Sequence, residues 1–252
     1  MINNKTILSV VTARAGSKGV PMKNVRDLMG YPLFMWSVFA STNSKYVDKT
    51  VISSNCPEVE KEYKKIIKMA EEWNMDTVKD VIFCRRPDEI SGPLSKNEEA
   101  LIHALHWMKE RDDVDYEVVI NLQPTSPCRI NNLLDACIEA YSEGGYDSLL
   151  TANKDTPFLW QLTNGKWEYT VDKNDCCDRK MRQELKEEEF VYHDNGNIYL
   201  MESKILLDKN CRIGYNPCIF ETKGINNLQI DEEFDFSLIE HLAKVQKIHS
   251  LV

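Results

Sequence analysis

Residues 6–19 read TILSVVTARAGSKG, a continuous β-branched and apolar run that passes directly into a loop of small and basic residues. A run of this kind is typical of a strand that is buried on both faces of a sheet. The run ends at Thr12, and residues 13–24 then contain two glycines and three cations. Ligands of open parallel α/β sheets bind at the carboxyl ends of the strands, so this stretch predicts both a fold class and the place of a site.

Strand and helix patterns alternate after this stretch. Further strands are predicted at 50–53, 81–84, 117–122, 148–152, 197–201 and 218–222, and helices at 32–40, 57–73, from Ser95 onward, 130–143 and 233–248. Ser95 and Glu98 fit a capping box at the start of the third helix. Repeated βα units of this size indicate an α/β fold with a mostly parallel sheet and helices on both faces.

A polar segment at about 153–192 interrupts the alternation. Asn164-Gly165 between two short strand patterns predicts a β-hairpin, in which Trp160, Trp167 and Tyr169 favour packing at an interface. Residues 172–189 are charged and have no large apolar face to bury locally. We therefore expect a single domain over residues 1–252 with an inserted dimerisation arm at 153–192, and a homodimer in solution.

Composition excludes several classes of protein. The net charge of -9 argues against nucleic-acid binding, and no apolar run approaches the ~18–20 residues that span a bilayer. The first apolar stretch is short and is followed at once by Arg14, which is unlike a signal peptide. The eight cysteines include no Cys-x-x-Cys pair. We expect a cytoplasmic protein with reduced thiols, no zinc site and no membrane partner.

The loop after the first strand has the composition of a phosphate-binding site. The small residues Ala15, Gly16, Ser17 and Gly19 let backbone N–H groups approach an anion closely. Arg14, Lys18 and Lys23 would supply three cations to a polyphosphate, and as loop cations they should contribute little to stability. The spacing is not that of a Walker-type loop. A solvated surface turn is the alternative interpretation of the same residues.

Three further segments carry polar side chains in a suggestive order. Residues 123–129 follow a predicted strand and combine two prolines with hydrogen-bond donors; a rigid βα connection capped by Thr125 or Ser126 is the alternative interpretation. Asn195-Gly196-Asn197 precedes another predicted strand. Residues 229–235 carry carboxylates that could hold Mg²⁺ together with substrate phosphates. An acidic helix N-terminus that complements the helix dipole is the alternative, and is favoured for Glu232 and Glu233.

Two other clusters of polar residues are better interpreted as structural than as functional. His103 and His106 lie three residues apart beside Glu99 on a predicted helix, but no third metal ligand is evident. Asp113-Val114-Asp115 imitates the Asp-x-Asp of metal-dependent glycosyltransferases, yet it precedes a strand and so lies at the wrong sheet edge. A solvated turn is the better interpretation of that segment.

Taken together, these segments resemble the acylneuraminate cytidylyltransferases, also called CMP-sialic acid synthetases. The resemblance covers essentially the whole chain in the right order, and its first two motifs are quite specific. The matching stretches are Arg14-x-Gly16-Ser17-Lys18-Gly19-x-x-x-Lys23-Asn24, Arg86-Pro87-x-Glu89-Ile90, Leu122-Gln123-Pro124-Thr125-Ser126-Pro127-x-Arg129, Arg182-Gln183-Glu184-Leu185, Asn195-Gly196-x-Ile198-Tyr199 and Ile230-Asp231-x-Glu233-x-Asp235.

The resemblance implies a Rossmann-like nucleotidyltransferase domain and a reaction. The anomeric hydroxyl of a nonulosonic, sialic-acid-like sugar acid would attack the α-phosphate of CTP, and pyrophosphate would leave. It implies catalytic roles for Arg14, Lys18, Lys23 and Asp231; nucleotide binding by Ala15, Gly16, Ser17, Gly19, Asn24, Arg86 and Asn97; and sugar binding by Gln123, Arg182, Asn195 and Gln229. Asp231 would coordinate the cofactor Mg²⁺. Which sugar acid is used is left open by the sequence.

The chain departs from the family at Gln229, where an Asp is usual. A neutral amide is a poorer Mg²⁺ ligand than a carboxylate, so either one or two metals is compatible with the sequence. Two other activities stay open: a nucleotide-sugar glycosyltransferase of related fold, and a non-catalytic protein that binds nucleotides or sugar acids.

Overall fold

The expected mostly parallel sheet is confirmed by a computed structural model, which describes residues 2–16, 19–72, 81–169, 180–248 and 250–252. The strands of the main sheet are β1 (Ile7–Thr12), β4 (Lys49–Ser54), β5 (Val81–Arg85), β6 (Val118–Leu122), β7 (Ser148–Asp155), β10 (Val191–Glu202) and β11 (Pro217–Glu221). Their order across the sheet is β11-β7-β10-β6-β1-β4-β5. Only β10 runs antiparallel to its neighbours in this sheet of described strands.

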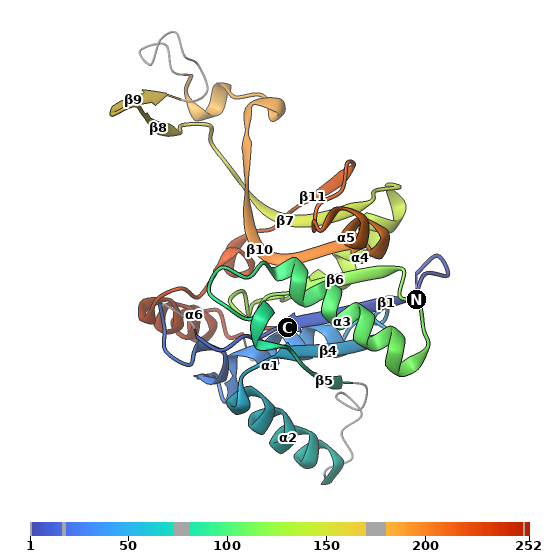
Figure 1. Cartoon of the computed structure of the whole chain (residues 1–252). Coiled ribbons are helices and arrows are strands. Elements are labelled where there is room, and N and C mark those ends of the chain that lie inside the picture. Colours follow the sequence, from blue (N-terminus) through green and yellow to red (C-terminus); the bar gives the residue numbers. More distant parts are fainter. Residues whose placement is uncertain (1, 17–18, 73–80, 170–179, 249) are drawn as a thin grey trace.

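Helices cover both faces of the sheet, as the alternating pattern predicts (Figure 1). They are α1 (Leu33–Thr42), α2 (Pro57–Glu72), α3 (Asn97–Asp112), α4 (Leu133–Glu143), α5 (Ser203–Lys209) and α6 (Glu233–Val245). Ile7 and Val11 of β1 pack with α1, α2 and α4, whereas Leu8 and Val10 pack with α3 and α5. The alternation of β1 between two apolar layers is the reason for its unbroken apolar sequence.

The strand order creates a crevice at one edge of the sheet. From β1 the chain proceeds to β4 and β5 on one side, and then returns to place β6 on the other side of β1. Side chains that follow β1, β5 and β6 therefore emerge at the same edge, beside the point where the strand order reverses.

The start of α3 differs from the expected Ser95–Glu98 capping box. The backbone N–H of Lys96 donates to the carboxylate of Glu99 at 2.9 Å, so the cap lies one residue later than predicted. The backbone N–H of Ser95 is already bonded to the carbonyl of Gly92 in a turn. Glu98 is thereby free to take another partner, Arg212.

The inserted segment projects away from the main sheet (Figure 1). The ends of β7 and β10 pair with one another as far as Asp155 and Val191 and form its stem. Beyond the stem lies the hairpin of β8 (Trp160–Thr163) and β9 (Lys166–Tyr169). Asn164 and Gly165 both have positive φ, which confirms the predicted two-residue turn. Residues 170–179, including Cys176 and Cys177, lie outside the described residues.

The Asn195-Gly196-Asn197 motif lies inside a strand rather than before one. The pairing of β10 with β7 shifts register between Asp194 and Tyr199, and the motif occupies this irregular stretch. Gly196 adopts a φ of 64° there, which a glycine does without strain. The bulge re-aims Asn195 toward neighbouring loops.

Arg129 is a buried clamp rather than a donor to the crevice. Its guanidinium donates to Ser37 Oγ at 3.0 Å, to the carbonyl of Gln123 at 3.0 Å and to the carbonyl of Asn197 at 2.8 Å. Burial lowers the pKa of Arg129 to about 9. The two carbonyls belong to the loop after β6 and to the bulge in β10, so Arg129 joins the two segments.

Replacing this clamp should cost stability. Arg129→Met removes three buried hydrogen bonds of the guanidinium, to Ser37, Gln123 and Asn197, and we expect the free energy of unfolding to fall by about 2–4 kcal/mol. Denaturant unfolding measures this loss. Arg85→Met is the matched control, because Arg85 is 72% exposed in its pair with Glu60 and should matter by less than about 0.5 kcal/mol. An unchanged unfolding midpoint for Arg129→Met would contradict the clamp.

Two further observations concern the cysteines and the length of the helices. The described cysteines are all free, and Cys56, Cys84, Cys128 and Cys137 are buried. None of the helices within the described residues is both long and apolar enough to cross a membrane.

Candidate active site

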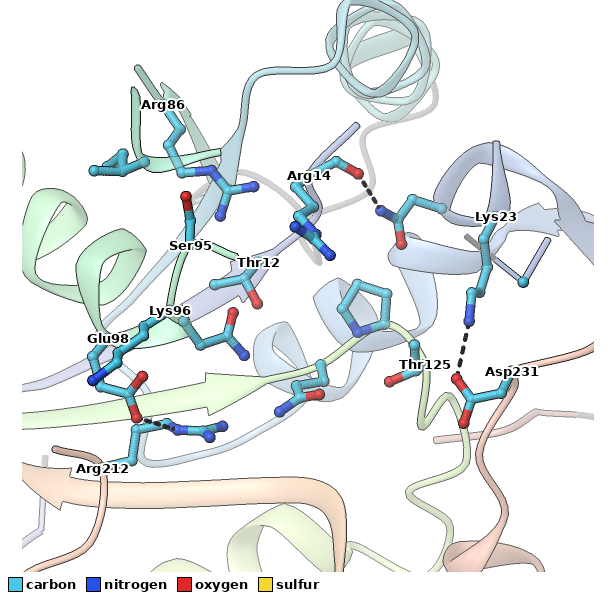
Figure 2. A pocket seen from close by; sticks show the side chains of 16 residues that line it. Thr12, Arg14, Lys23, Arg86, Ser95, Lys96, Glu98, Thr125, Arg212 and Asp231 are labelled. Atoms are coloured by element: carbon cyan, nitrogen blue, oxygen red, sulfur yellow. Dashed lines mark hydrogen bonds and ion pairs between the residues drawn. The ribbon is translucent and has the colours of Figure 1, made fainter. Parts of the chain in front are cut away.

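A pocket of about 700 Å³ occupies the crevice at the carboxyl ends of β1, β5 and β6 (Figure 2). Its lining is rich in cations and amides and contains few apolar side chains. The lining residues are Thr12, Arg14, Gly19, Lys23, Asn24, Arg86, Ile90, Ser95, Lys96, Asn97, Glu98, Gln123, Pro124, Thr125, Arg212 and Asp231. The structure thus brings together most of the residues that the sequence predicts for the nucleotide.

Hydrogen bonds hold the loop after β1 in shape. Asn24 Nδ2 donates to the carbonyl of Arg14 at 2.9 Å, and the N–H of Ala15 donates to Asn55 Oδ1 at 2.9 Å. The guanidinium of Arg14 also donates to the carbonyl of Gly92. These bonds fix the backbone of the loop, while the Arg14 side chain points into the pocket (Figure 2).

Gly19 is required by close packing. A Cβ at this position would lie 2.1 Å from the carbonyl oxygen of Asp231, which is closer than any side chain can approach. The absence of a side chain lets the loop after β1 contact the segment that carries Asp231. Gly16 has a φ of 80°, a backbone conformation that glycine adopts without strain because it has no side chain. Ser17 and Lys18 lie outside the described residues, so their expected roles stay predictions.

Lys23 is buried, contrary to the expectation of an exposed loop cation. Its side chain is only 9% exposed, and Nζ donates to the carbonyl of Ile230 at 2.5 Å and to Asp231 Oδ1 at 3.2 Å. The fold places Lys23 in a short 3₁₀ turn that packs against the segment before α6. Lys23 therefore enters the pocket as a preorganised cation, and its removal should affect stability more than the sequence suggests.

Asp231 offers an exposed carboxylate at the pocket. Its side chain is 71% exposed, and one oxygen contacts Lys23. Asp235 accepts from the N–H groups of Asp231 and Glu232 at 2.7 Å each and so caps α6, as the helix-terminus interpretation predicts for this acidic segment. No group of three or more His, Cys, Asp or Glu side chains that could hold a metal occurs among the described residues. Mg²⁺ needs only one or two carboxylates beside substrate phosphates, so Asp231 alone fits such an ion.

Arg86 is an unpaired cation in the wall of the pocket. The residue is 4% exposed, and its Nε and Nη2 atoms have no hydrogen-bond partner. Burial, and then the nearby charge of Arg14, lower the pKa of Arg86 to about 10. Within the described part of the chain no carboxylate forms an ion pair with Arg14 or Arg86. Two uncompensated guanidinium groups in one pocket predict an anionic ligand.

The amino end of α3 adds to this anion-attracting wall. Asn97 is the first residue of α3, and Ser95, Lys96 and Asn97 all line the pocket. The N-terminal end of a helix carries partial positive charge and free N–H groups, which suit a phosphate or an electronegative edge of a base. Gln123 and Thr125, after β6, also line the pocket. The N–H of Ile230 donates to the carbonyl of Thr125 at 2.7 Å and ties the Asp231 segment to the same loop.

Three residues predicted to bind the sugar do not line this pocket. Asn195 is buried, and its amide is occupied by Thr222 Oγ1 at 2.6 Å, Asn227 Oδ1 at 3.1 Å and Thr151 Oγ1 at 2.8 Å. Gln229 donates its side-chain N–H to the carbonyl of Asn195. The contacts of these two side chains in the described structure are structural, and any contact with a sugar stays a prediction.

Arg182 lies at a separate pocket of about 730 Å³ at the base of the arm, lined also by Lys154, Gln183 and Phe190. Within a single chain it is therefore not brought together with Gln123 and Asp231. A contribution of Arg182 to a sugar-binding site stays a prediction.

Glu98 and Arg212 are pocket residues that the sequence interpretation missed. Glu98 appears in the sequence as a helix-capping residue, and Arg212 lies in a polar loop without any motif. Arg212 Nε donates to Glu98 Oε1 at 2.8 Å across 114 positions of sequence. Predicting this pair would have required knowledge of a long-range contact, which no local sequence pattern provides.

The two weaker sequence clusters have structural partners. His103 Nδ1 lies 3.7 Å from the buried thiol of Cys84, and burial lowers the pKa of His103. Asp113 and Asp115 both pair with Lys109, at 3.3 Å and 2.9 Å, in an exposed turn before β6. Both observations agree with the structural interpretations of these clusters.

Comparison with known proteins identifies the family. The family model described as cytidylyltransferase matches residues 8–249. The chain belongs to the cytidylyltransferase family. A solved structure of CMP:2-keto-3-deoxy-manno-octonic acid synthetase complexed with CTP has a TM-score of 0.65 and 14% identity, and the match covers 97% of this chain and 100% of that one. At this identity the likeness shows the fold, which is the Rossmann-like fold of nucleotidyltransferases.

Curated relatives match over most of the length of this chain. N-acylneuraminate cytidylyltransferase A of Danio rerio is 26% identical over 94% of the chain. CMP-N,N'-diacetyllegionaminic acid synthase of Campylobacter jejuni is 25% identical over 96% of the chain. The chain spans 50% of the length of the Danio rerio relative and 97% of that of the Campylobacter jejuni relative.

Proposed function

We propose that this chain transfers CMP from CTP to the anomeric hydroxyl of a nonulosonic sugar acid and releases pyrophosphate. The observation that carries the proposal is the pair of uncompensated guanidinium groups, Arg14 and Arg86, in a polar pocket at the strand switch. The relatives in this family are named for sialic-acid-like sugars, which supports the acceptor class. We infer that residues 1–252 act as one nucleotidyltransferase domain, with 153–192 as its arm.

We infer a place in the pocket for each part of the two substrates. Arg14 and Lys23, with the backbone of residues 15–19, would receive the triphosphate, and Asn24 would keep that loop in shape. Arg86 and Asn97, the first residue of α3, would face the ribose and cytosine. Gln123, which also lines the pocket, would contact the acceptor. Catalysis would then consist of positioning and charge neutralisation.

The chemical step is an in-line displacement at phosphorus. The anomeric oxygen forms a bond to the α-phosphorus, and the bond from this phosphorus to the oxygen bridging the β-phosphate breaks. Pyrophosphate leaves with that oxygen, and the hydroxyl proton is released. Lys23 and Arg14 would stabilise the negative charge that grows on the departing group. Mg²⁺ held by Asp231 would supply further neutralisation of the triphosphate when bound.

We further propose that Asp231 is the only side-chain ligand of magnesium in this pocket. Gln229 stands where a second carboxylate is usual in the family, and its amide is used by the carbonyl of Asn195. An amide committed to a backbone carbonyl is poorly placed to replace a carboxylate at a divalent cation.

A homodimer is the proposed assembly. Trp160 and Trp167 on the arm are 52% and 67% exposed, so within the described residues the arm presents aromatic surface to solvent. Arg182 lies near the base of the arm and away from the pocket of its own chain. In a dimer, the arm of one chain would bring Arg182 to the acceptor bound by the other.

Charged substitutions on the arm should separate the dimer. We expect light scattering at micromolar concentration to give twice the chain mass for the wild type and a single chain mass for Trp160→Glu/Trp167→Glu, because burying two unpaired carboxylates in an apolar interface is costly. Tyr215→Glu is the control, since Tyr215 is 87% exposed but lies outside the arm. A monomeric wild type would contradict the proposed assembly.

Pyrophosphate release tests the proposed function. The assay offers CTP and Mg²⁺ with a panel of sialic, legionaminic, pseudaminic and eight-carbon sugar acids, and we expect release with at least one nonulosonic acid. Release with the eight-carbon acid alone would contradict the acceptor class. Binding of CTP without any release would favour a non-catalytic nucleotide-binding protein, and transfer from a nucleotide sugar would favour a glycosyltransferase.

A further inference from the structure

An ion pair between Arg212 and Glu98 forms one wall of the pocket. Arg212 Nε donates to Glu98 Oε1 at 2.8 Å, and the two side chains are 23% and 13% exposed. The guanidinium carbon lies 4.3 Å from the ring centre of Tyr199 on β10. Glu98 belongs to the first turn of α3. Arg212 is therefore held by a helix on one side and by a central strand on the other.

The support behind Arg212 is itself fixed. The hydroxyl of Tyr199 donates to both oxygens of Asp194 at 2.8 Å, and burial together with Asp194 raises the pKa of Tyr199. The phenol therefore stays protonated and the ring stays in place. Glu98 and Tyr199 thus orient Arg212, and Asp194 in turn holds Tyr199. The Nη1 atom of Arg212 nevertheless has no hydrogen-bond partner. A guanidinium held this firmly with unused donor capacity is typical of a recognition group rather than of a surface ion pair.

The position of the pair distinguishes it from the phosphate-binding cations. Figure 2 shows Arg212 and Glu98 on one side of the pocket, and Lys23 and Asp231 on the opposite side. Arg14 and Arg86 have no carboxylate partner within the described residues, whereas Arg212 is neutralised by Glu98. A neutralised pair is a weak attractor for a second full anion, but it presents N–H donors and a carboxylate acceptor next to one another.

We propose that Arg212 and Glu98 determine specificity for the acceptor by recognising an acylamino substituent of the sugar acid. An acylamino group offers one carbonyl acceptor and one N–H donor, which match the guanidinium of Arg212 and the carboxylate of Glu98. A hydroxyl group in the same place has its donor and its acceptor on one oxygen atom, whereas the acylamino group presents them on two atoms that can each face one of the two side chains. The inference rests on the proposed cytidylyl transfer and adds the feature of the acceptor that this chain selects.

The experiment compares two acceptors that differ at one substituent. With saturating CTP, kcat/KM is measured for N-acetylneuraminic acid and for its analogue with a hydroxyl in place of the acetamido group. We expect Arg212→Met to lower kcat/KM for the acylated acceptor by about tenfold, through the acceptor KM, and to leave the hydroxyl analogue within about threefold. The KM for CTP should change by less than about twofold. Glu98→Gln should shift the preference in the same direction by a smaller factor.

Matched controls separate recognition from folding. Arg111→Met removes an arginine of α3 that, like Arg212, lies over an aromatic ring, Trp107 at 5.7 Å, and beside a carboxylate, Asp112 at 3.3 Å. It lies outside the pocket and should leave both acceptors unchanged. If Arg212→Met lowers Tm markedly, Arg212→Lys is used instead, since it keeps the charge but offers one ammonium in place of the planar fork. This variant should also lose the preference for the acylated acceptor.

The possible outcomes are distinct. Equal losses for both acceptors, or a raised KM for CTP, would overturn the specificity role of Arg212 while cytidylyl transfer stands. Turnover of the hydroxyl analogue alone by the wild type would likewise overturn it. An absence of pyrophosphate release from the wild type with every sugar acid would overturn the proposed function and the inference with it.

Discussion

Lys23→Ala is expected to lower kcat/KM for CTP by about 10²-fold or more, and Arg14→Ala by a similar factor. Both side chains reach the pocket from the loop after β1, and Lys23 is preorganised by the carbonyl of Ile230. A preorganised charge that meets the developing negative charge of the leaving group contributes mainly to the transition state. Pyrophosphate release at varied CTP measures the effect.

Controls for this prediction follow from the different burial of the cations. Lys45→Ala removes a lysine that is 61% exposed in a surface pair with Glu139, and it should leave activity unchanged. Because Lys23 is buried, Tm is recorded for each variant, and Lys23→Met preserves the apolar packing of the side chain. Activity of Lys23→Ala and Arg14→Ala within a few-fold of the wild type would refute the phosphate-binding role.

Asp231→Asn is expected to abolish magnesium-dependent turnover. Asp231 and Glu98 carry the two carboxylates among the described residues that line the pocket. Glu98 is already paired with Arg212, which leaves the carboxylate of Asp231 for a metal. An amide at position 231 keeps the size of the side chain and removes the charge that Mg²⁺ requires. Titration of Mg²⁺ against pyrophosphate release measures the loss, and calorimetry of CTP binding with and without Mg²⁺ provides a readout that does not depend on turnover.

The substitution Gln229→Asp tests the single-carboxylate arrangement by adding a carboxylate instead of removing one. A second negative charge near the divalent cation should lower the Mg²⁺ concentration for half-maximal activity by about fivefold, by the Coulomb energy expected at several ångströms in water. Glu232→Gln is the matched control, because Glu232 is an exposed neighbour of Asp231 that does not line the pocket. An unchanged titration for Gln229→Asp would mean that a charge at residue 229 lies too far from the metal to affect its binding. Full activity of Asp231→Asn would show the metal assignment to be wrong.

The sequence by itself determined the core of the fold and the place of the site. The apolar run of β1 has to be covered on both faces, and this requirement predicts helices on either side of a parallel sheet. Small residues after β1 and donors after β6 then meet at one edge, because parallel strands share the direction of their carboxyl ends. The turn at Asn164-Gly165 could also be predicted from the local sequence, because both residues tolerate positive φ.

The tertiary structure alone decided how polar side chains are shared between the site and the framework. Arg129, Asn195 and Gln229 look like binding residues in the sequence, but they are occupied by backbone carbonyls or by other side chains. Arg212 lacks any motif, yet it lines the pocket through its contact with Glu98, 114 positions away. Side-chain type and spacing report local geometry, whereas burial and long-range partners exist only after the strands have paired, so no local pattern could have separated these residues.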